Sequence, residues 1–91
     1  MIKFDLVKKV ALKSEVPRDT CERVINDFLY CLNHALLDHK RVEIRNFGIF
    51  KVVKVASRIA RDLNTDTPMV LPALWRIKFI PGKNIKEKLN A

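Results

Sequence analysis

Apolar residues recur with a helical period over the first forty positions of the chain. Between Lys3 and Lys13 they fall on one side of a helix built at 100° per residue, and the lysines fall mostly on the other side. Pro17 suits the first turn of a second helix, which is expected from about Arg18 to about Asp38. The apolar stripe of this second helix covers roughly 160°, whereas a helix packed on one neighbour needs about 100°. The width of the stripe predicts two partners, the chain's own core and a second subunit.

After residue 40 the period changes from 3.6 residues to 2, which is typical of strands. Residues 42–45 alternate apolar with polar side chains, residues 49–56 resume as a strand, and Gly48 between them permits a tight turn or a bulge. Alternation returns at residues 75–79, and residues 83–89 then show the pattern of a short helix. The second part of the chain is therefore expected to form an antiparallel sheet with a terminal helix.

Together these elements predict one α+β domain over residues 1–91, in which residues 1–40 form a helical dimerisation base. Residues 41–83 are expected to form the sheet and a long β-arm, and residues 83–91 the short C-terminal helix. The arm is expected at about residues 53–74, because this stretch has too few large apolar residues to build a core of its own.

Positive charge is concentrated in the second half of the chain. The protein has a net charge of +8 and a pI near 9.9. Residues 1–40 hold 7 Lys/Arg against 6 Asp/Glu, a net of +1, and residues 41–91 hold 11 against 4, a net of +7. This balance favours nucleic acid or another anionic surface as the partner, and charge alone does not separate DNA from structured RNA.

The strand pattern places cations on one face of the predicted sheet. Arg76 and Lys78 alternate with large apolar residues, and Arg45 and Lys51 are expected beside them on nearby strands. A sheet that is apolar on one face and cationic on the other is a platform for a phosphate backbone. The alternative is an ordinary solvated face.

The sequence offers little for catalysis, metal binding or disulfide formation. Cys21 and Cys31 would lie ~15 Å apart along one helix, beyond disulfide reach, and are expected to be two small buried hydrophobic residues. No pattern pairs His34 or His39 with a nucleophile, and the chain has no glycine-rich phosphate loop. We therefore expect no enzymatic activity, no metal, no cofactor and no small-molecule substrate.

The start of the chain does not resemble a targeting signal. Charged residues interrupt the apolar residues of Met1–Lys9, so no apolar run of signal-peptide length is present. No segment approaches the length of a membrane span. The chain is therefore expected in the cytoplasm, without a membrane partner.

Three blocks of sequence together resemble one known family. They are Phe47-Gly48-Ile49-Phe50, the arm residues Arg58 and Arg61 with Thr65 at the tip, and Phe79-Ile80-Pro81-Gly82-Lys83. In this order and spacing they resemble the bacterial histone-like DNA-binding proteins, which comprise HU and integration host factor. The resemblance covers the whole chain and needs no inserted gap.

The resemblance implies an intertwined dimer, in which helices form the base and two β-arms reach around double-stranded DNA from a concave saddle. It also implies that the arms lie in the minor groove, where an apolar tip residue, here Leu63, wedges between base pairs. The residues expected to bind DNA are Lys3, Arg45, Lys51, Lys54, Arg58, Arg61, Leu63, Arg76, Lys78, Lys83 and Lys86. The residues expected at the dimer interface are Phe28, Leu29, Leu32, Leu36, Phe47, Phe50 and Phe79.

The arm tip departs from the family pattern. The family usually has Arg-Asn-Pro at this place, whereas this chain has Arg61-Asp62-Leu63 and a further acid at Asp66. Two Asp against two Arg leave the tip nearly neutral, and leucine occupies the wedge position of proline. Val53 and Val55 stand where members often have cations. DNA binding is therefore expected to depend more on the saddle and its flanks than on the arm tip.

The leading hypothesis is a nucleoid-associated protein that binds duplex DNA largely without sequence specificity and bends or compacts it. A sequence-specific bender like integration host factor is a second option, because its specificity would depend on DNA deformability. An assembly or protein-interaction module with weakened DNA binding is a third, and the acidic arm tip motivates it. The partner subunit is expected to be an identical chain, with a heterodimer of paralogues as the alternative.

Overall fold

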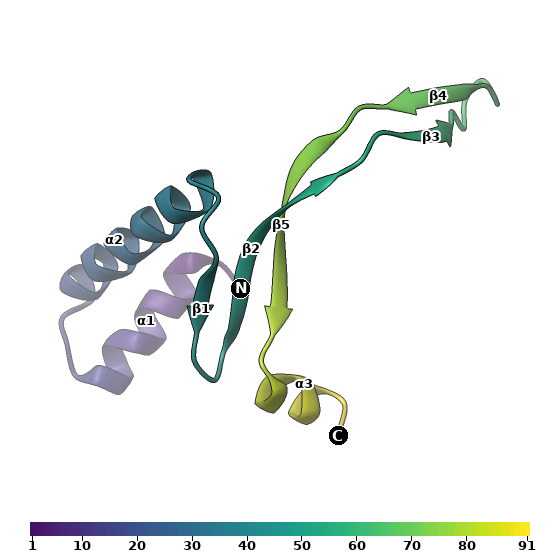
Figure 1. Ribbon diagram of the computed structural model, residues 1–91. Coiled ribbons are helices and arrows are strands. Elements are labelled where there is room, and N and C mark those ends of the chain that lie inside the picture. The colour runs from purple at the N-terminus through teal and green to yellow at the C-terminus, as the bar shows by residue number, and fades with distance from the viewer. The chain divides into compact units, whose positions relative to one another are not determined.

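The protein, described over residues 1–91 by a computed structural model, consists of two compact units, Met1–Ala35 and Leu36–Ala91. The first unit contains α1 (Lys3–Ser14) and nearly all of α2 (Arg18–Leu37) (Figure 1). The second contains β1 (Val42–Ile44), β2 (Gly48–Val55), β3 (Arg58–Arg61), β4 (Pro68–Leu71), β5 (Leu74–Pro81) and α3 (Lys83–Leu89). The predicted α+β class is confirmed.

The first helix, α1, has defined ends. The Ile2 N–H donates a hydrogen bond of 2.8 Å to the carboxylate of Asp5, which satisfies a free donor at the start of α1. Glu15 adopts a left-handed conformation with φ 55°, and this ends the helix. α2 then runs beside α1, and Lys3 Nζ donates a hydrogen bond of 2.6 Å to Asn26 Oδ1 between the helices.

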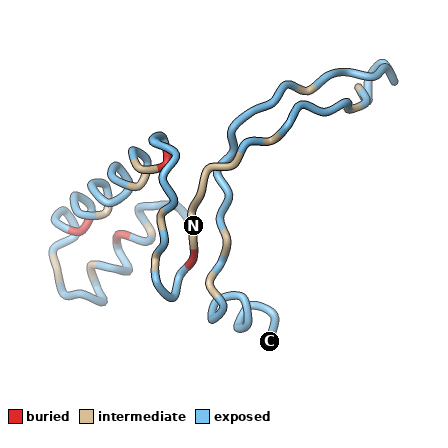
Figure 2. The backbone as a smooth tube through the Cα atoms, in the orientation of Figure 1, coloured by how far each residue is buried: buried red, intermediate tan, exposed pale blue.

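Few side chains are buried in either unit (Figure 2). The buried hydrophobic residues are Val7, Cys21 and Leu36. The prediction that Cys31 is buried was wrong: it is exposed on the same side of α2 as Val24 and Phe28, which are 61% and 52% exposed. A chain that buries so little apolar surface is marginal alone, and a second subunit is needed to cover that side.

Three strands of the second unit form an antiparallel sheet in the order β1-β2-β5. β2 and β5 are paired along their whole length, from Gly48 opposite Pro81 to Val55 opposite Leu74. β1 is shorter and pairs with the start of β2. The chain enters α3 directly after β5, and the Gly82 N–H donates a hydrogen bond of 2.8 Å to the Phe47 carbonyl at this corner.

The turn between β1 and β2 is made differently from the way the sequence suggested. Asn46, not Gly48, takes the positive φ of 65°, which asparagine tolerates well. The Phe47 N–H closes this turn on the Ile44 carbonyl at 3.0 Å. Gly48 lies in β2 and is buried, and a Cβ there would approach the Ile80 carbonyl oxygen to 2.6 Å. The glycine therefore provides room for the neighbouring strand.

β3 and β4 form a separate two-stranded ribbon that continues from β2 and β5 (Figure 1). Its register pairs Arg58 with Leu71 and Arg61 with Pro68. Most of its side chains are exposed, as expected for an arm without a core. The arm therefore depends on backbone hydrogen bonds and on its tip loop for its shape.

The close approach at Gly48 leads to a stability prediction. We expect Gly48→Ala to lower the free energy of unfolding by about 1–3 kcal/mol, because the added methyl group must displace the Ile80 backbone or the Phe79 ring. Urea unfolding at one protein concentration measures the change. Gly82→Ala is the matched control and should cost less, since its Cβ would lie 3.1 Å from the Phe47 oxygen. Equal losses for the two variants would contradict the steric explanation.

Candidate nucleic-acid interface

The pairing of β2 with β5 brings three predicted cations onto one face of the sheet. Lys51 lies directly opposite Lys78, and Val53 lies opposite Arg76. Residues opposite each other share a face, and side chains two positions apart along a strand do so as well. Lys51, Arg76 and Lys78 therefore form one positively charged surface, which we call the basic face.

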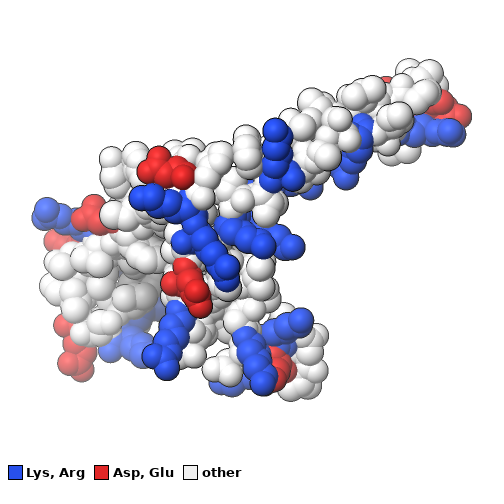
Figure 3. Space-filling view, viewed as in Figure 1, with Lys and Arg blue, Asp and Glu red and all other residues white.

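The basic face has almost no negative charge to balance it. None of its three cations takes part in an ion pair. Glu43 in β1 is the only acidic residue of the sheet, and it lies on this face because it pairs with Ile49, two positions before Lys51. Two lysines directly opposite each other destabilise a strand pair. Figure 3 shows Lys and Arg side chains on the body of the molecule and along the arm, with acidic side chains among them on the body and at the arm's end. An anion on this face would relieve the repulsion between Lys51 and Lys78.

Lys54 is separated from the other predicted DNA-binding lysine of β2. It lies opposite Trp75, on the other face of the sheet, and its Nζ is 5.5 Å from the centre of that ring. The His39 ring approaches the same indole, with 4.4 Å between ring centres. The spacing of three residues between Lys51 and Lys54 already predicts from the sequence that they lie on opposite faces of the strand. The contact between His39 and Trp75 can be seen only in the structure.

Three further predicted DNA-binding residues lie at or near α3: Lys83 and Lys86 within the helix, and Arg45 near its start. Arg45 belongs to the β1–β2 turn and lines a hollow of about 170 Å³ that Gly82 also lines. Lys83 follows Gly82 and forms an exposed ion pair with Glu87 at 3.8 Å. The second unit thus places Arg45 close to the residue at which α3 begins. Lys3, the remaining predicted flank residue, belongs to the first unit.

The arm does not present its two arginines on the same face. Arg58 and Arg61 are three positions apart in β3, so their side chains leave opposite faces of the ribbon. Arg61 shares its face with Ile59 and is held by Asp66, with 3.2 Å between Nη1 and Oδ1. The ion pair is exposed and contributes little to stability, but it partly neutralises the charge of Arg61 at the tip.

The tip loop is held by its own hydrogen bonds. The Asp62 N–H donates to the Thr67 carbonyl at 2.9 Å, and the Asp66 N–H donates to the Asp62 carbonyl at 2.7 Å. The Asn64 N–H donates to the Asp62 carboxylate at 2.9 Å, which is a local turn typical of aspartate. Leu63 projects from this loop with 96% of its surface exposed. An ordered loop with a bare apolar side chain can insert that side chain into another molecule.

Three of the predicted interface residues form an aromatic cluster in the second unit. The centres of the Phe50 and Phe79 rings are 4.8 Å apart, and those of Phe47 and Phe79 are 5.3 Å apart. Phe50 and Phe79 lie opposite each other on the face of the sheet that the basic cations do not occupy. Phe47 and Phe79 remain exposed, so the single chain leaves the cluster incompletely covered.

The other predicted interface residues lie on α2. Phe28 and Leu29 are exposed and Leu32 is half-buried, so all three are available for contact with a second chain. Leu36 is already buried in the single chain and belongs to its own packing. The exposed apolar side of α2 agrees with the wide stripe seen in the sequence.

The structure assembles no other chemical site of the kinds considered. No group of three or more His, Cys, Asp or Glu side chains is placed to hold a metal ion. Neither long helix contains a stretch apolar enough to cross a membrane. The basic face and the arm are therefore the features that a functional interpretation has to explain.

Comparisons with known proteins give a consistent result. A family model described as bacterial DNA-binding protein matches residues 1–90. The chain is 32% identical to integration host factor subunit beta of Halorhodospira halophila, over 100% of this chain and 90% of that protein. It is 33% identical to DNA-binding protein HU of Thermotoga maritima, over 99% of this chain and 100% of that protein.

Solved structures agree with these sequence matches. An Anabaena HU crystallised with DNA matches with a TM-score of 0.89 and 29% identity, over 98% of this chain and 97% of that chain. A variant of HU from Thermotoga maritima matches with a TM-score of 0.72 and 25% identity, over 98% of this chain and 99% of that chain. Both similarities extend over nearly the whole chain.

Lys51 and Lys78 lie opposite each other and repel. Removing this repulsion should make the protein more stable. We expect Lys78→Glu to raise the free energy of unfolding by about 0.2–1 kcal/mol at low salt, because repulsion across the strands becomes attraction. The gain should shrink at high salt. Urea unfolding at one protein concentration measures both values. Lys54→Glu makes the same change of charge on the other face and should give no gain, and a loss for Lys78→Glu would contradict the prediction.

Proposed function

This chain belongs to the bacterial DNA-binding protein family, and from that premise we propose that it binds double-stranded DNA as a dimer, largely without sequence specificity, and bends it. The family is one of DNA-binding proteins, so the protein acts by binding and shaping its partner and not by catalysis. Association with the nucleoid, and hence a cytoplasmic location, is part of the same proposal.

The basic face is the single observation that carries this proposal. Lys51 and Lys78 face each other beside Arg76, without an ion pair, at a cost in stability that a phosphate backbone would offset. Each lysine or arginine that neutralises a phosphate releases a condensed counterion, and this release favours binding.

The chemistry of the basic face also supports limited specificity. In its strand positions the face has Lys and Arg but no Asn or Gln, the amides that pair with adenine edges. Contacts to phosphates position a protein on the duplex without reading its sequence directly. The preference of this protein among DNA sites would therefore come mainly from how easily a site bends.

The arm supports the bending part of the proposal. Leu63 is almost fully exposed on a loop whose backbone is fixed by hydrogen bonds. Apolar side chains of this kind insert between base steps from the minor groove and kink the duplex. Arg58 would meet phosphates from one face of the arm, whereas Arg61 must first leave Asp66. We therefore assign more of the affinity to the basic face and more of the bend to the tip.

The dimer follows from the apolar surface that a single chain leaves uncovered. Exposed Phe28 on α2 and the partly exposed cluster around Phe79 are the main surfaces that a second subunit would cover. A dimer would also supply two arms and two basic faces to one duplex. Lys3, Arg45, Lys83 and Lys86 are proposed as additional phosphate-binding residues on the flanks.

A salt series tests the proposal directly. Log Kd for a duplex should change linearly with log salt, by about 0.9 for each phosphate that the protein neutralises. We expect Arg76→Ala and Lys78→Ala each to weaken binding on all duplex sequences and to reduce this slope by about 1.8, because each variant of the dimer leaves two phosphates, one per subunit, without their cations. Fluorescence anisotropy with a labelled duplex at several salt concentrations provides the measurement.

The sequence led us to expect Lys54 at the DNA, but the proposed interface leaves it out because it lies on the opposite face of the sheet. Lys54→Ala is therefore the control for this series, because it removes one positive charge from the same sheet. Its slope should stay close to that of the unmodified protein. If the protein shows no salt-dependent binding to duplex, nicked or junction DNA, the proposed function is wrong. If all three variants reduce the slope equally, the assignment to the basic face is wrong.

Leu63 provides a separate test of bending. We expect Leu63→Ala to reduce the bend of a bound duplex more than it reduces affinity, because alanine is too small to separate stacked bases. Energy transfer between dyes at the two ends of the duplex reports the bend, and anisotropy reports the affinity. Arg58→Ala should show the reverse pattern. Equal bend angles for Leu63→Ala and the unmodified protein would remove Leu63 from the bending step.

A further inference from the structure

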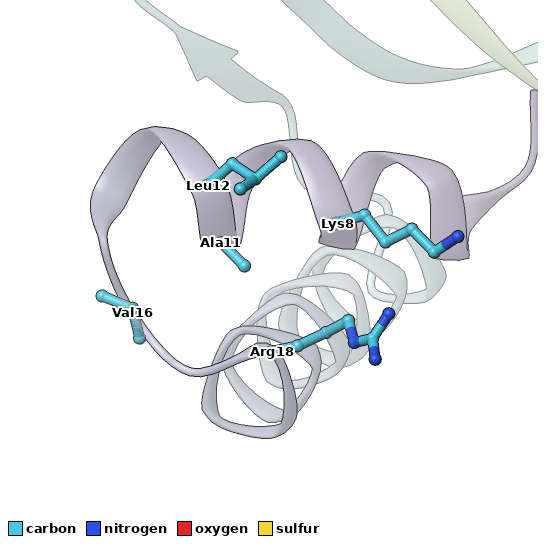
Figure 4. A pocket seen from close by; sticks show the side chains of 5 residues that line it. All are labelled: Lys8, Ala11, Leu12, Val16 and Arg18. Carbon is cyan, nitrogen blue, oxygen red and sulfur yellow. The ribbon is translucent and has the colours of Figure 1, made fainter.

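The corner between α1 and α2 contains a hollow that the proposed DNA-binding residues do not line. It has a volume of about 400 Å³, and its lining comes from α1, the connecting turn and the first residue of α2. The residues that line it are Lys8, Ala11, Leu12, Val16 and Arg18 (Figure 4). Three of them are aliphatic and two are cationic, so the hollow has an apolar floor and a positively charged edge.

Lys8 and Arg18 lie close together at this edge, and neither is paired with an acidic side chain. Lys8 Nζ lies 5.0 Å from the centre of the Phe4 ring, and Arg18 Cζ lies 5.5 Å from the same centre. Neither side chain is part of an ion pair. Leu12 beside them is 82% exposed. The site therefore has the composition of a receptor for an apolar side chain that is accompanied by carboxylates.

The arm tip of this chain combines an apolar side chain with two carboxylates, although Arg58 and Arg61 leave its net charge near zero. Leu63 is its most exposed large hydrophobic residue, and Asp62 and Asp66 stand on either side of it in the loop. Only one oxygen of Asp66 is engaged by Arg61, and only one oxygen of Asp62 accepts the Asn64 N–H. Each carboxylate thus keeps an oxygen for another cation.

We propose that the arm tip of one chain docks into the α1–α2 hollow of a second copy, with Leu63 on the apolar floor and Asp62 and Asp66 near Lys8 and Arg18. The interaction joins two different surfaces, so it can repeat from one dimer to the next and build larger assemblies. DNA would compete with it, because the same leucine cannot occupy a base step and the hollow. The interaction does not require DNA, and its test uses none.

Sedimentation velocity of the full chain without DNA, at low salt and over a range of protein concentrations, tests the proposal. We expect species larger than the dimer that increase with concentration and decrease with added salt. The double variant Lys8→Glu, Arg18→Glu should weaken this association at least about tenfold, because two attractions become repulsions. The double variant Lys9→Glu, Lys13→Glu makes the same change of charge on α1 outside the hollow, and it should associate like the unmodified protein.

Mixing a variant with a changed tip and a variant with a changed hollow gives a more specific test of docking. The variant Asp62→Asn, Asp66→Asn keeps its loop, since asparagine accepts the same turn hydrogen bond and tolerates the positive φ of position 66. It should not associate alone, because its tip lacks the carboxylates. When it is mixed with Lys8→Glu, Arg18→Glu, the intact tips of one protein can meet the intact hollows of the other, and the larger species should return.

Three results would overturn the proposal: no species larger than the dimer at any concentration, equal association of Lys8→Glu, Arg18→Glu and Lys9→Glu, Lys13→Glu, or no recovery on mixing. None of these results bears on DNA binding. Anisotropy with a labelled duplex, at protein concentrations too low for the larger species to form, should show the same affinity for Lys8→Glu, Arg18→Glu and for Lys9→Glu, Lys13→Glu, since the two variants have equal charge. The docking interaction and the proposed DNA binding can therefore fail separately.

Discussion

Eight consecutive residue pairs, from Gly48 with Pro81 to Val55 with Leu74, hold β2 and β5 in one register. A slip of one residue would exchange the two faces of either strand, so this register decides which side chains form the basic face. It places Lys51 beside Lys78 and Arg76, and it turns Phe79 to the other face. Gly48 keeps the register in place, because the Ile80 carbonyl lies too close for any side chain at that position.

The same register also sets a tension between stability and binding. Lys51 opposite Lys78 opposes folding of the sheet, yet it concentrates positive charge where a phosphate backbone would lie. At the arm tip, by contrast, positive charge is not concentrated, because Asp66 forms an ion pair with Arg61 within the chain. Affinity and distortion of the DNA are thus assigned to different parts of the second unit, and Leu63 remains available for insertion.

Apolar surface that the single chain leaves open is the other general property of this protein. The buried hydrophobic residues are few, while Phe28 and other large apolar side chains are exposed. A dimer explains the apolar side of α2 and the cluster around Phe79. It does not by itself explain why Lys8 and Arg18 gather on Phe4 beside an apolar hollow, and docking of a further copy accounts for that arrangement.

The sequence by itself determined the elements and the class of partner, because hydrophobic period, charge excess and the glycine and proline positions act locally along the chain. It did not place Asn46 at the positive φ of the turn, Cys31 on an uncovered side of α2, or Asp66 against Arg61. The tertiary structure alone decided those points and the gathering of Lys8 with Arg18. These points depend on turn geometry or on contacts between side chains distant in the sequence, whereas periodicity describes only how a residue lies within its own element.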